Sequence, residues 1–229
     1  MVKYIYNLQK GMSMKNIFKR GFTLSEALIT LTVVGVVAIL VVPGLIKDTT
    51  DKARIALLQS TISSIHNAIQ NEIIRTGANN LKNTKLATPV EFLKTLDISE
   101  VRNDVLAFGH GENMSMKTLN GETKTRSFAS YFDIASAKLK NGATVQMFHY
   151  SDSYSIAIDI NGKEEPNIIG IDIFPDIIIG NINSDFTREH VGDIGYCGHF
   201  DETIEKCKEG SGCYCLLEQS GFDPHYLDE

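Results

Sequence analysis

The chain has 229 residues with 43% hydrophobic content, which is enough for one ordinary domain and an additional segment. The formal net charge is -6. Residues 1–21 carry five basic residues and no acid, so the charge of the rest is -11; the five are Lys3, Lys10, Lys15, Lys19 and Arg20. An acidic chain of this kind argues against nonspecific binding to nucleic acid or to anionic lipid.

The first element in chain order is an apolar run from Ala27 to Ile46 that contains no charged residue. As a helix it spans about 30 Å, the thickness of a bilayer's hydrocarbon core. A secretory signal would have a shorter apolar region and a small-x-small cleavage site, and neither is present. Because the basic residues precede the run, the positive-inside rule predicts a cytoplasmic N-terminus and an extracytoplasmic remainder.

One carboxylate, Glu26, stands at the edge of this run. A charged side chain in hydrocarbon costs about 2.5–3.5 kcal/mol, so its presence calls for a partner. The plainer interpretation is a Glu that reaches the headgroups of an ordinary signal anchor.

The stretch G-F-T-L-S-E from Gly21 to Glu26, followed by an apolar helix with Gly35 and Pro43, resembles the class III signal of type IV pilins and type II secretion pseudopilins. The resemblance covers about 25 residues. It implies that a prepilin peptidase cuts after Gly21 and methylates the new N-terminus on Phe22. Residues 1–21 are then the leader, and because family leaders are short, Met12 or Met14 is an alternative start.

The resemblance also implies roles for two residues of the helix. The carboxylate of Glu26 would pair with the terminal amine of a neighbouring subunit, and an unpaired buried carboxylate would penalise a subunit that docks out of register. Pro43 would mark a kink, with a helix end as the alternative. The implied partners are the peptidase, other pilin or pseudopilin subunits and an inner-membrane assembly platform.

The helix is predicted to continue from residue 47 to 77 as an amphipathic segment. Gly77 suits the position after its end, and the whole helix would run from about Thr23 to Thr76. The apolar positions follow steps of three and four: Ile55, Leu58, Ile62, Ile65, Ile69 and Ile73. We expect the membrane and filament-core part at residues 22–46 and one face of residues 47–77 on a globular domain at 78–229.

The domain is predicted to be α+β, with the long helix packed on an antiparallel sheet. Residues 78–87 read as a loop, and T-P-V-E from Thr88 predicts a capped helix to about Leu96. Asn141-Gly142 between alternating runs predicts a hairpin within 138–148. Further strands are predicted at 154–160 and 168–174. The stretch from Asp159 to Phe174 resembles one common in pseudopilin-like proteins.

Several oxygen-bearing side chains lie close together between Asp159 and Asp172. Some major pseudopilins bind calcium in a C-terminal loop, so a calcium site at Asp159, Asn161 and Asp172 is one expectation. The EF-hand spacing fails because Gly162 directly follows Asn161. A turn at Asn161-Gly162 with solvated acids is the favoured interpretation, and no other cofactor is expected.

All four cysteines, Cys197, Cys207, Cys213 and Cys215, fall near the C-terminus. With His199 they could bind zinc, but Cys-x-Cys is tighter than the usual zinc spacing and an oxidising compartment favours disulfides. A bond between Cys213 and Cys215 would strain the geometry, which leaves Cys197 and Cys207 to pair with them in either order.

These observations favour a structural function, a pilin-like subunit of a secretion or pilus filament in the cytoplasmic membrane. No signature of nucleophilic, metalloprotease or phosphate-binding sites is found, so an enzyme is not expected. One alternative is a DNA-uptake minor pilin, which the acidic chain disfavours. Another is a membrane-anchored enzyme or binding domain with a pilin-like anchor.

Overall fold

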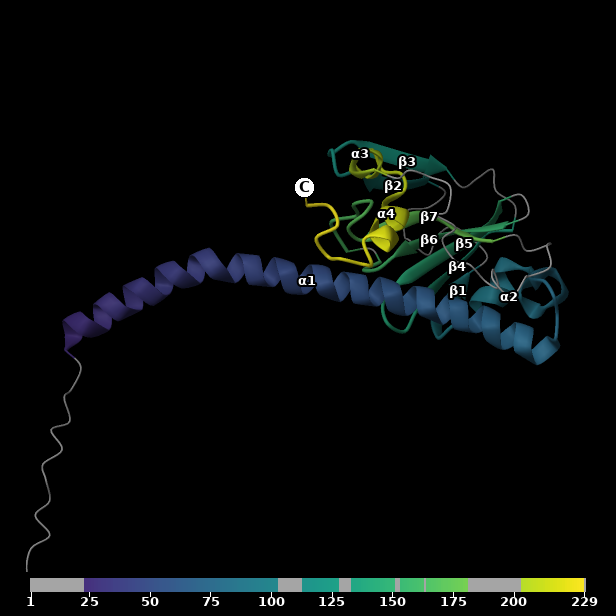
Figure 1. Ribbon diagram of the computed structural model, residues 1–229, viewed down its shortest axis with the longest axis horizontal. Helices are drawn as coiled ribbons and strands as arrows, with labels where there is room; N and C mark the ends of the chain where they lie inside the picture. The colour runs from purple at the N-terminus through teal and green to yellow at the C-terminus, as the bar shows by residue number, and fades with distance from the viewer. Residues whose placement is uncertain are drawn as a thin grey trace, which may run out of the picture. The chain divides into compact units, whose positions relative to one another are not determined.

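The computed structural model describes residues 23–102, 113–127, 133–150, 153–162, 164–180 and 203–228. The chain divides into two compact units, Met1–Ile46 and Lys47–Glu229. The predicted α+β class is confirmed, because a long N-terminal helix is followed by an antiparallel sheet domain (Figure 1).

The long helix α1 spans Leu24–Thr76 and agrees with the predicted helix to within one residue at its start. It runs through Pro43, so the alternative of a helix end there is wrong, whereas the predicted kink stays a prediction. At the other end Gly77 adopts a φ of +66°, which favours glycine, and its N–H donates to the Ile73 carbonyl at 2.8 Å.

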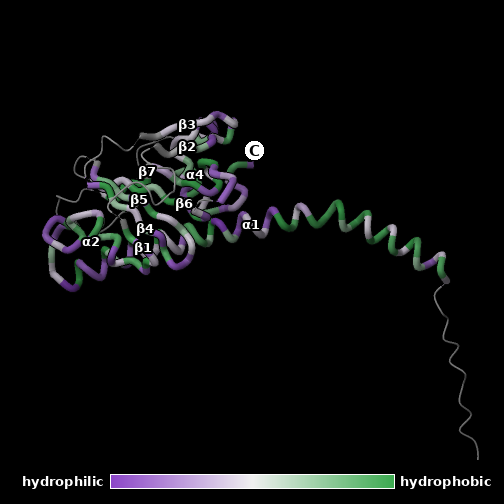
Figure 2. The backbone as a smooth tube through the Cα atoms, turned by 180° about the vertical axis from the view of Figure 1, so that it is seen from behind, coloured by the Kyte–Doolittle hydropathy of each residue, from purple (hydrophilic) through white to green (hydrophobic). Residues whose placement is uncertain are grey.

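The part of α1 within the first unit is apolar all round (Figure 2). Its large hydrophobic side chains are exposed, from 46% at Val42 to 82% at Leu24. Among the described helices α1 is the one long and apolar enough to cross a membrane, by length and composition. A helix of this kind is stable in lipid or when other helices cover it.

Five strands form the main sheet, in the order β1-β4-β5-β6-β7 and all antiparallel to their neighbours. A separate hairpin pairs β2 with β3. The bounds are β1 Ile98–Arg102, β2 Asn113–Lys117, β3 Thr123–Ser127, β4 Ala135–Leu139, β5 Thr144–Tyr150, β6 Ser153–Asp159 and β7 Ile173–Ile179. Of these, β1 and the β2–β3 hairpin were not predicted.

Short helices complete the domain. They are the 3-10 turns Leu81–Asn83 and Lys85–Ala87, α2 Pro89–Leu93, α3 Ile204–Lys208 and α4 Cys213–Gln219. Thr88 caps α2 as predicted, since its hydroxyl accepts from the Glu91 N–H at 3.4 Å. The two 3-10 turns lie where a plain loop was predicted.

The main core lies between the second half of α1 and one face of the sheet. Ile55, Leu58, Ile65 and Ile69 of α1 are buried there as the spacing predicted, while Ile62 and Ile73 are only partly buried. Strand side chains meet them at alternate positions: Ala135, Ala137 and Leu139 of β4, Val145 and Met147 of β5, and Tyr154, Ile156 and Ile158 of β6. Alternation places the polar residues on the other face.

The predicted hairpin is present, and its turn is fastened to α1. Gly142 has a φ of +97° between β4 and β5, as the Asn-Gly pair requires. The Asn141 side chain accepts from the Ala143 N–H at 3.1 Å and donates to the Thr61 hydroxyl at 3.3 Å. Thr61 is fully buried in α1, so this contact explains a polar residue in an otherwise apolar face.

The predicted strand at 168–174 is wrong in its bounds, because β7 begins at Ile173. Ile168 and Ile169 form isolated β-bridges and residues 170–172 a turn instead. The Asp172 carboxylate accepts backbone N–H bonds from Asn167 at 2.8 Å and Ile168 at 2.6 Å. These bonds fold the backbone back on itself and replace the ladder bonds of a strand.

The end of α1 is fastened by one buried carboxylate. Glu72 accepts from the Arg75 side chain at 2.6 and 2.9 Å and from the Lys85 N–H at 3.2 Å. The Arg75 hydrogen bonds, followed by the Lys85 N–H, lower the pKa of Glu72 against the opposing effect of burial. A carboxylate whose pKa is lowered by folding stabilises the fold fully at pH values above its ordinary pKa. This contribution is lost as the pH falls through the pKa of the folded state.

We therefore predict that Glu72→Gln lowers the free energy of unfolding at pH 7 by about 1–3 kcal/mol, since it removes hydrogen bonds to a charged group. The free energy of unfolding of the variant should also change less with pH below 4.5, the ordinary pKa of a Glu side chain. Denaturant unfolding of the detergent-solubilised chain between pH 3 and pH 7 measures both effects. Glu91→Gln, at an exposed pair with Lys94, is the matched control and should behave as the wild type.

Candidate functional site

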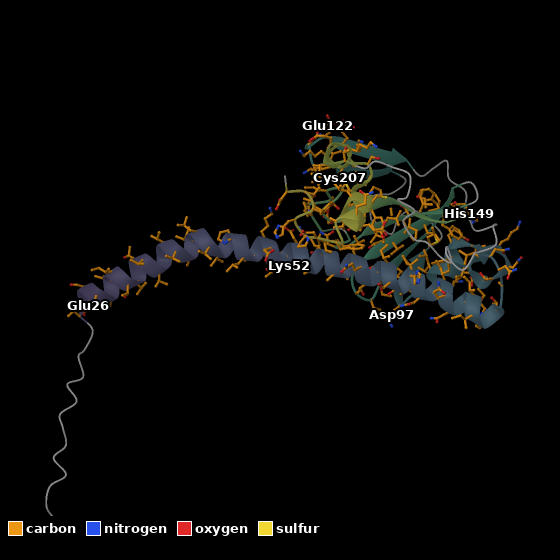
Figure 3. The ribbon with its side chains drawn as sticks, in the orientation of Figure 1. Glu26, Lys52, Asp97, Glu122, His149 and Cys207 are labelled. Carbon is orange, nitrogen blue, oxygen red and sulfur yellow. A yellow bond between two sulfur atoms is a disulfide. The ribbon has the colours of Figure 1, made fainter. Side chains whose placement is uncertain are left out.

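Three regions carry most of the predicted site residues: the start of α1, the loop between β6 and β7, and the C-terminal helices α3 and α4. Gly21 and Phe22 lie outside the described residues, as do Cys197 and His199. Glu26 lies in the first turn of α1 (Figure 3).

The start of α1 is a capping box. The Thr23 hydroxyl accepts from the Glu26 N–H at 3.2 Å, and Glu26 Oε2 accepts from the Thr23 N–H and from the Thr23 hydroxyl, both at 2.9 Å. These reciprocal bonds satisfy backbone donors that a helix start leaves without partners. Thr23 was missed as a functional residue, although the pattern T-x-x-E was a sufficient signal for it.

The box determines where the carboxylate lies. Because Glu26 is bonded to Thr23, its charge is kept at the very beginning of the helix, where the macrodipole also favours a negative group. The chain cut after Gly21 would begin one residue before Thr23. The Glu26 carboxylate would then lie beside the new positive end of its own chain, in the region where a neighbouring amine would also have to approach.

The second region is the β6–β7 loop, here the described residues 160–162 and 164–172. Asp159 at the end of β6 and Asp172 just before β7 are both fully buried. Asp159 Oδ1 accepts from the backbone N–H of Asn161 at 3.2 Å and of Gly162 at 2.8 Å. Asp172 Oδ2 accepts from Asn161 Nδ2 at 3.1 Å, so one hydrogen-bond network joins the two acids.

This network contains more acceptors than donors. Asp159 Oδ2, Asn161 Oδ1 and Asn167 Oδ1 are buried and have no hydrogen-bond partner. The Asn161 amide orientation follows from its two acceptors, because Nδ2 donates to the Glu165 carbonyl and to Asp172. Three unpartnered oxygens in one buried network call for a positive or proton-donating group.

The electrostatics of the loop agree with this imbalance. Burial, and to a smaller extent the nearby Asp172 charge, raise the pKa of Asp159 to about 7 against the lowering effect of the two backbone N–H bonds. A carboxyl group in this state is costly to ionise where it lies unless a cation neutralises it.

The predicted calcium residues Asp159, Asn161 and Asp172 are thus brought together, and the favoured turn is also present, with Gly162 at a φ of +69°. Both oxygens of Asp172 already accept N–H bonds. Asn167, which no motif singled out, has a buried side-chain oxygen, Oδ1, without a hydrogen-bond partner. Within the described ranges, no group of three or more His, Cys, Asp or Glu side chains is arranged to hold a metal.

The three cysteines among the described residues are disulfide-bonded. Cys207 of α3 bonds to Cys213 of α4, and Cys215 is disulfide-bonded as well. Cys207 and Cys213 are buried in a second core with Met116 of β2 and Ile169 of the β6–β7 loop. Figure 3 shows Cys207 beneath the hairpin that carries Glu122. The bond thus joins α3 to α4, and the packing of its two cysteines against Met116 holds these helices on the hairpin side of the domain.

The comparisons identify the N-terminal region. Residues 18–42 match the prokaryotic N-terminal methylation motif. Comparison with curated proteins and with solved structures finds no match. The chain therefore carries a type IV pilin-like class III prepilin signal, and this motif supports a precursor of the pilin or pseudopilin type.

The motif implies processing by a prepilin peptidase and assembly with other pilin subunits, and it points to a structural subunit. The single N-terminal apolar helix fits a protein anchored in the inner membrane.

Proposed function

We propose that the protein is a subunit of a type II secretion or type IV pilus filament, cut after Gly21 and assembled by packing of α1 against other subunits. The observation that carries the proposal is the methylation motif at residues 18–42 on a helix whose apolar side chains the chain itself leaves exposed. The N-terminus is cytoplasmic, and the domain beyond Ile46 is extracytoplasmic. An inner-membrane assembly platform receives the subunit.

In this proposal Glu26 sets the register between subunits. The capping box satisfies the carboxylate before assembly, and the terminal amine of a neighbour supplies a charged donor once both groups leave the lipid headgroups. Because the amine is charged as well as the carboxylate, this bond adds the attraction of opposite charges, which the uncharged Thr23 donors do not supply. DNA uptake and an enzyme on a pilin-like anchor rank lower, since the chain is acidic and no catalytic signature was found.

We predict that mass spectrometry of the membrane-extracted protein shows a chain beginning at a methylated Phe22. The basic residues keep the leader on the cytoplasmic side, so the bond after Gly21 lies at the membrane surface, where the peptidase can reach it. Cleavage should therefore be complete in cells with active prepilin peptidase. An intact leader in such cells would count against the proposed processing. Cells without the peptidase are the control and should retain residues 1–21.

We predict that Glu26→Ala inserts into the membrane as the wild type does but enters filaments at least about tenfold less, since a registry pair worth over 1.4 kcal/mol is lost. Immunoblotting of sheared filaments against the membrane fraction measures the ratio. Thr30→Ala, one turn further along the helix, is the control. Undiminished incorporation of Glu26→Ala would remove the registry role.

A second candidate function is cation binding at the β6–β7 loop, which the three unpartnered oxygens favour. Asp159, Asn161 and Asn167 would supply oxygen ligands, and Asp172 would hold the loop in shape through its N–H bonds. Carboxylate and amide oxygens are the ligands that calcium prefers. Backbone carbonyls and water would complete the coordination.

We predict that 1 mM Ca²⁺ raises the Tm of the detergent-solubilised chain by roughly 4 °C at pH 8, where Asp159 can ionise, relative to a chelator. Asp159→Asn should abolish the shift without unfolding the domain, because its carbonyl oxygen can still accept the N–H bonds of Asn161 and Gly162. The matched control is Asp97→Asn, at an exposed pair with Lys140 (Figure 3), and it should keep the shift. An Asp159→Asn chain that still responds to Ca²⁺ would overturn the cation site.

A further inference from the structure

The sequence contains three Asn-Gly pairs, at residues 120–121, 141–142 and 161–162. In such a pair the backbone nitrogen of the glycine can attack the side-chain amide carbon of the asparagine, because glycine has no Cβ to obstruct the approach. A new C–N bond closes a succinimide ring, and the amide nitrogen leaves as ammonia with the proton of the glycine N–H. Water then opens the ring at one of its two carbonyl carbons and gives aspartate or isoaspartate.

The backbone does not distinguish the three pairs. Each glycine has a positive φ, which is +81° at Gly121, +97° at Gly142 and +69° at Gly162. Each glycine N–H also donates one hydrogen bond, to a backbone carbonyl or to Asp159 Oδ1, at 2.8–3.1 Å. The surroundings of the asparagine side chain therefore decide which pair reacts in the folded chain.

The fold restrains two of the asparagine side chains. Asn141 donates from Nδ2 to the Thr61 hydroxyl at 3.3 Å and accepts on Oδ1 the backbone N–H two residues further on, at 3.1 Å. Asn161 donates from Nδ2 to the Glu165 carbonyl at 3.3 Å and to Asp172 Oδ2 at 3.1 Å. Each side chain has to leave both bonds before its amide carbon can face the glycine nitrogen, which slows the reaction.

The third asparagine, Asn120, is not restrained in this way. It lies in the turn between β2 and β3, where Asn120, Gly121 and Glu122 are all exposed. Figure 3 shows Glu122 at the outer margin of the domain. Among the described residues the Asn120 side chain has no hydrogen-bond partner, while its backbone N–H donates to the Lys208 carbonyl of α3 at 3.4 Å. The amide can therefore turn toward Gly121 without breaking a side-chain bond.

We propose that Asn120 is a modification site of the folded protein, converted to aspartate or isoaspartate by attack of the Gly121 nitrogen, whereas Asn141 and Asn161 react only when the domain opens. The reaction consumes one water molecule and releases ammonia. Each event makes the net charge more negative by one unit. Isoaspartate also inserts a carbon into the backbone of the turn, so the turn changes shape where it contacts Lys208 of α3.

Incubation of the purified full chain in detergent at pH 8 tests this assignment, with peptide mass spectrometry to follow conversion at each asparagine. In the folded chain Asn120 should react at least about tenfold faster than Asn141 or Asn161. In the urea-unfolded chain the three rates should agree within about threefold, because the same chemistry is then equally accessible at each pair. A folded chain whose Asn120 reacts no faster than the other two would overturn the modification site. A tenfold excess that persists in urea would overturn the role of the fold.

Two variants separate the parts of the proposal, and the wild-type comparison needs neither of them to fold. Thr61→Val removes the hydroxyl that accepts from Asn141 and keeps the β-branched shape, so Asn141 should react at least about threefold faster and Asn120 at an unchanged rate. An unchanged Asn141 rate would overturn its protection by α1. Asn120→Gln keeps an amide that cyclises far more slowly, so the acidic isoform seen by isoelectric focusing should disappear. An acidic isoform of undiminished abundance in this variant would contradict the site.

Discussion

The exposed apolar surface of α1 between Leu24 and Ile46 is the constraint on which the rest of the structure depends. Each large hydrophobic side chain gains about 1.5–3 kcal/mol when it leaves water, and this segment has no domain of its own to cover it. The segment must lie in lipid or against other helices. The methylation motif at residues 18–42 overlaps the same segment. In the proposed function, the apolar surface therefore serves an anchored precursor first and an assembled subunit afterwards.

The N–H groups at the start of an apolar helix need hydrogen-bond partners both in lipid and against other helices. The capping box between Thr23 and Glu26 supplies these partners within the chain. It also gives the Glu26 carboxylate a hydrogen-bond donor before any neighbouring subunit binds. A carboxylate is also hydrogen-bonded at the other end of α1, where Glu72 accepts from the Arg75 side chain and from the Lys85 N–H. Both carboxylates are held by hydrogen bonds whose donors lie nearby in the sequence or in the adjoining turn.

The elements that could be predicted are those with local signals. Helix α1 follows from its apolar pattern, the α2 cap from Thr88 and Pro89, and the β4–β5 hairpin from Asn141-Gly142. The β6–β7 loop could not be predicted as a turn after Ile168, because its residues are strand formers and the decisive bonds come from Asp172. The unpartnered oxygen of Asn167 depends on tertiary burial, which no spacing reveals.

The central claim is that the apolar half of α1 packs against the same half of other subunits after it leaves the lipid. A photo-crosslinking residue at Val36, in the middle of the exposed segment, tests it most directly in cells with an active assembly system. The account predicts adducts one subunit larger than the monomer, which disappear when the prepilin peptidase is absent. Crosslinks to lipid alone in those assembly-competent cells would contradict it.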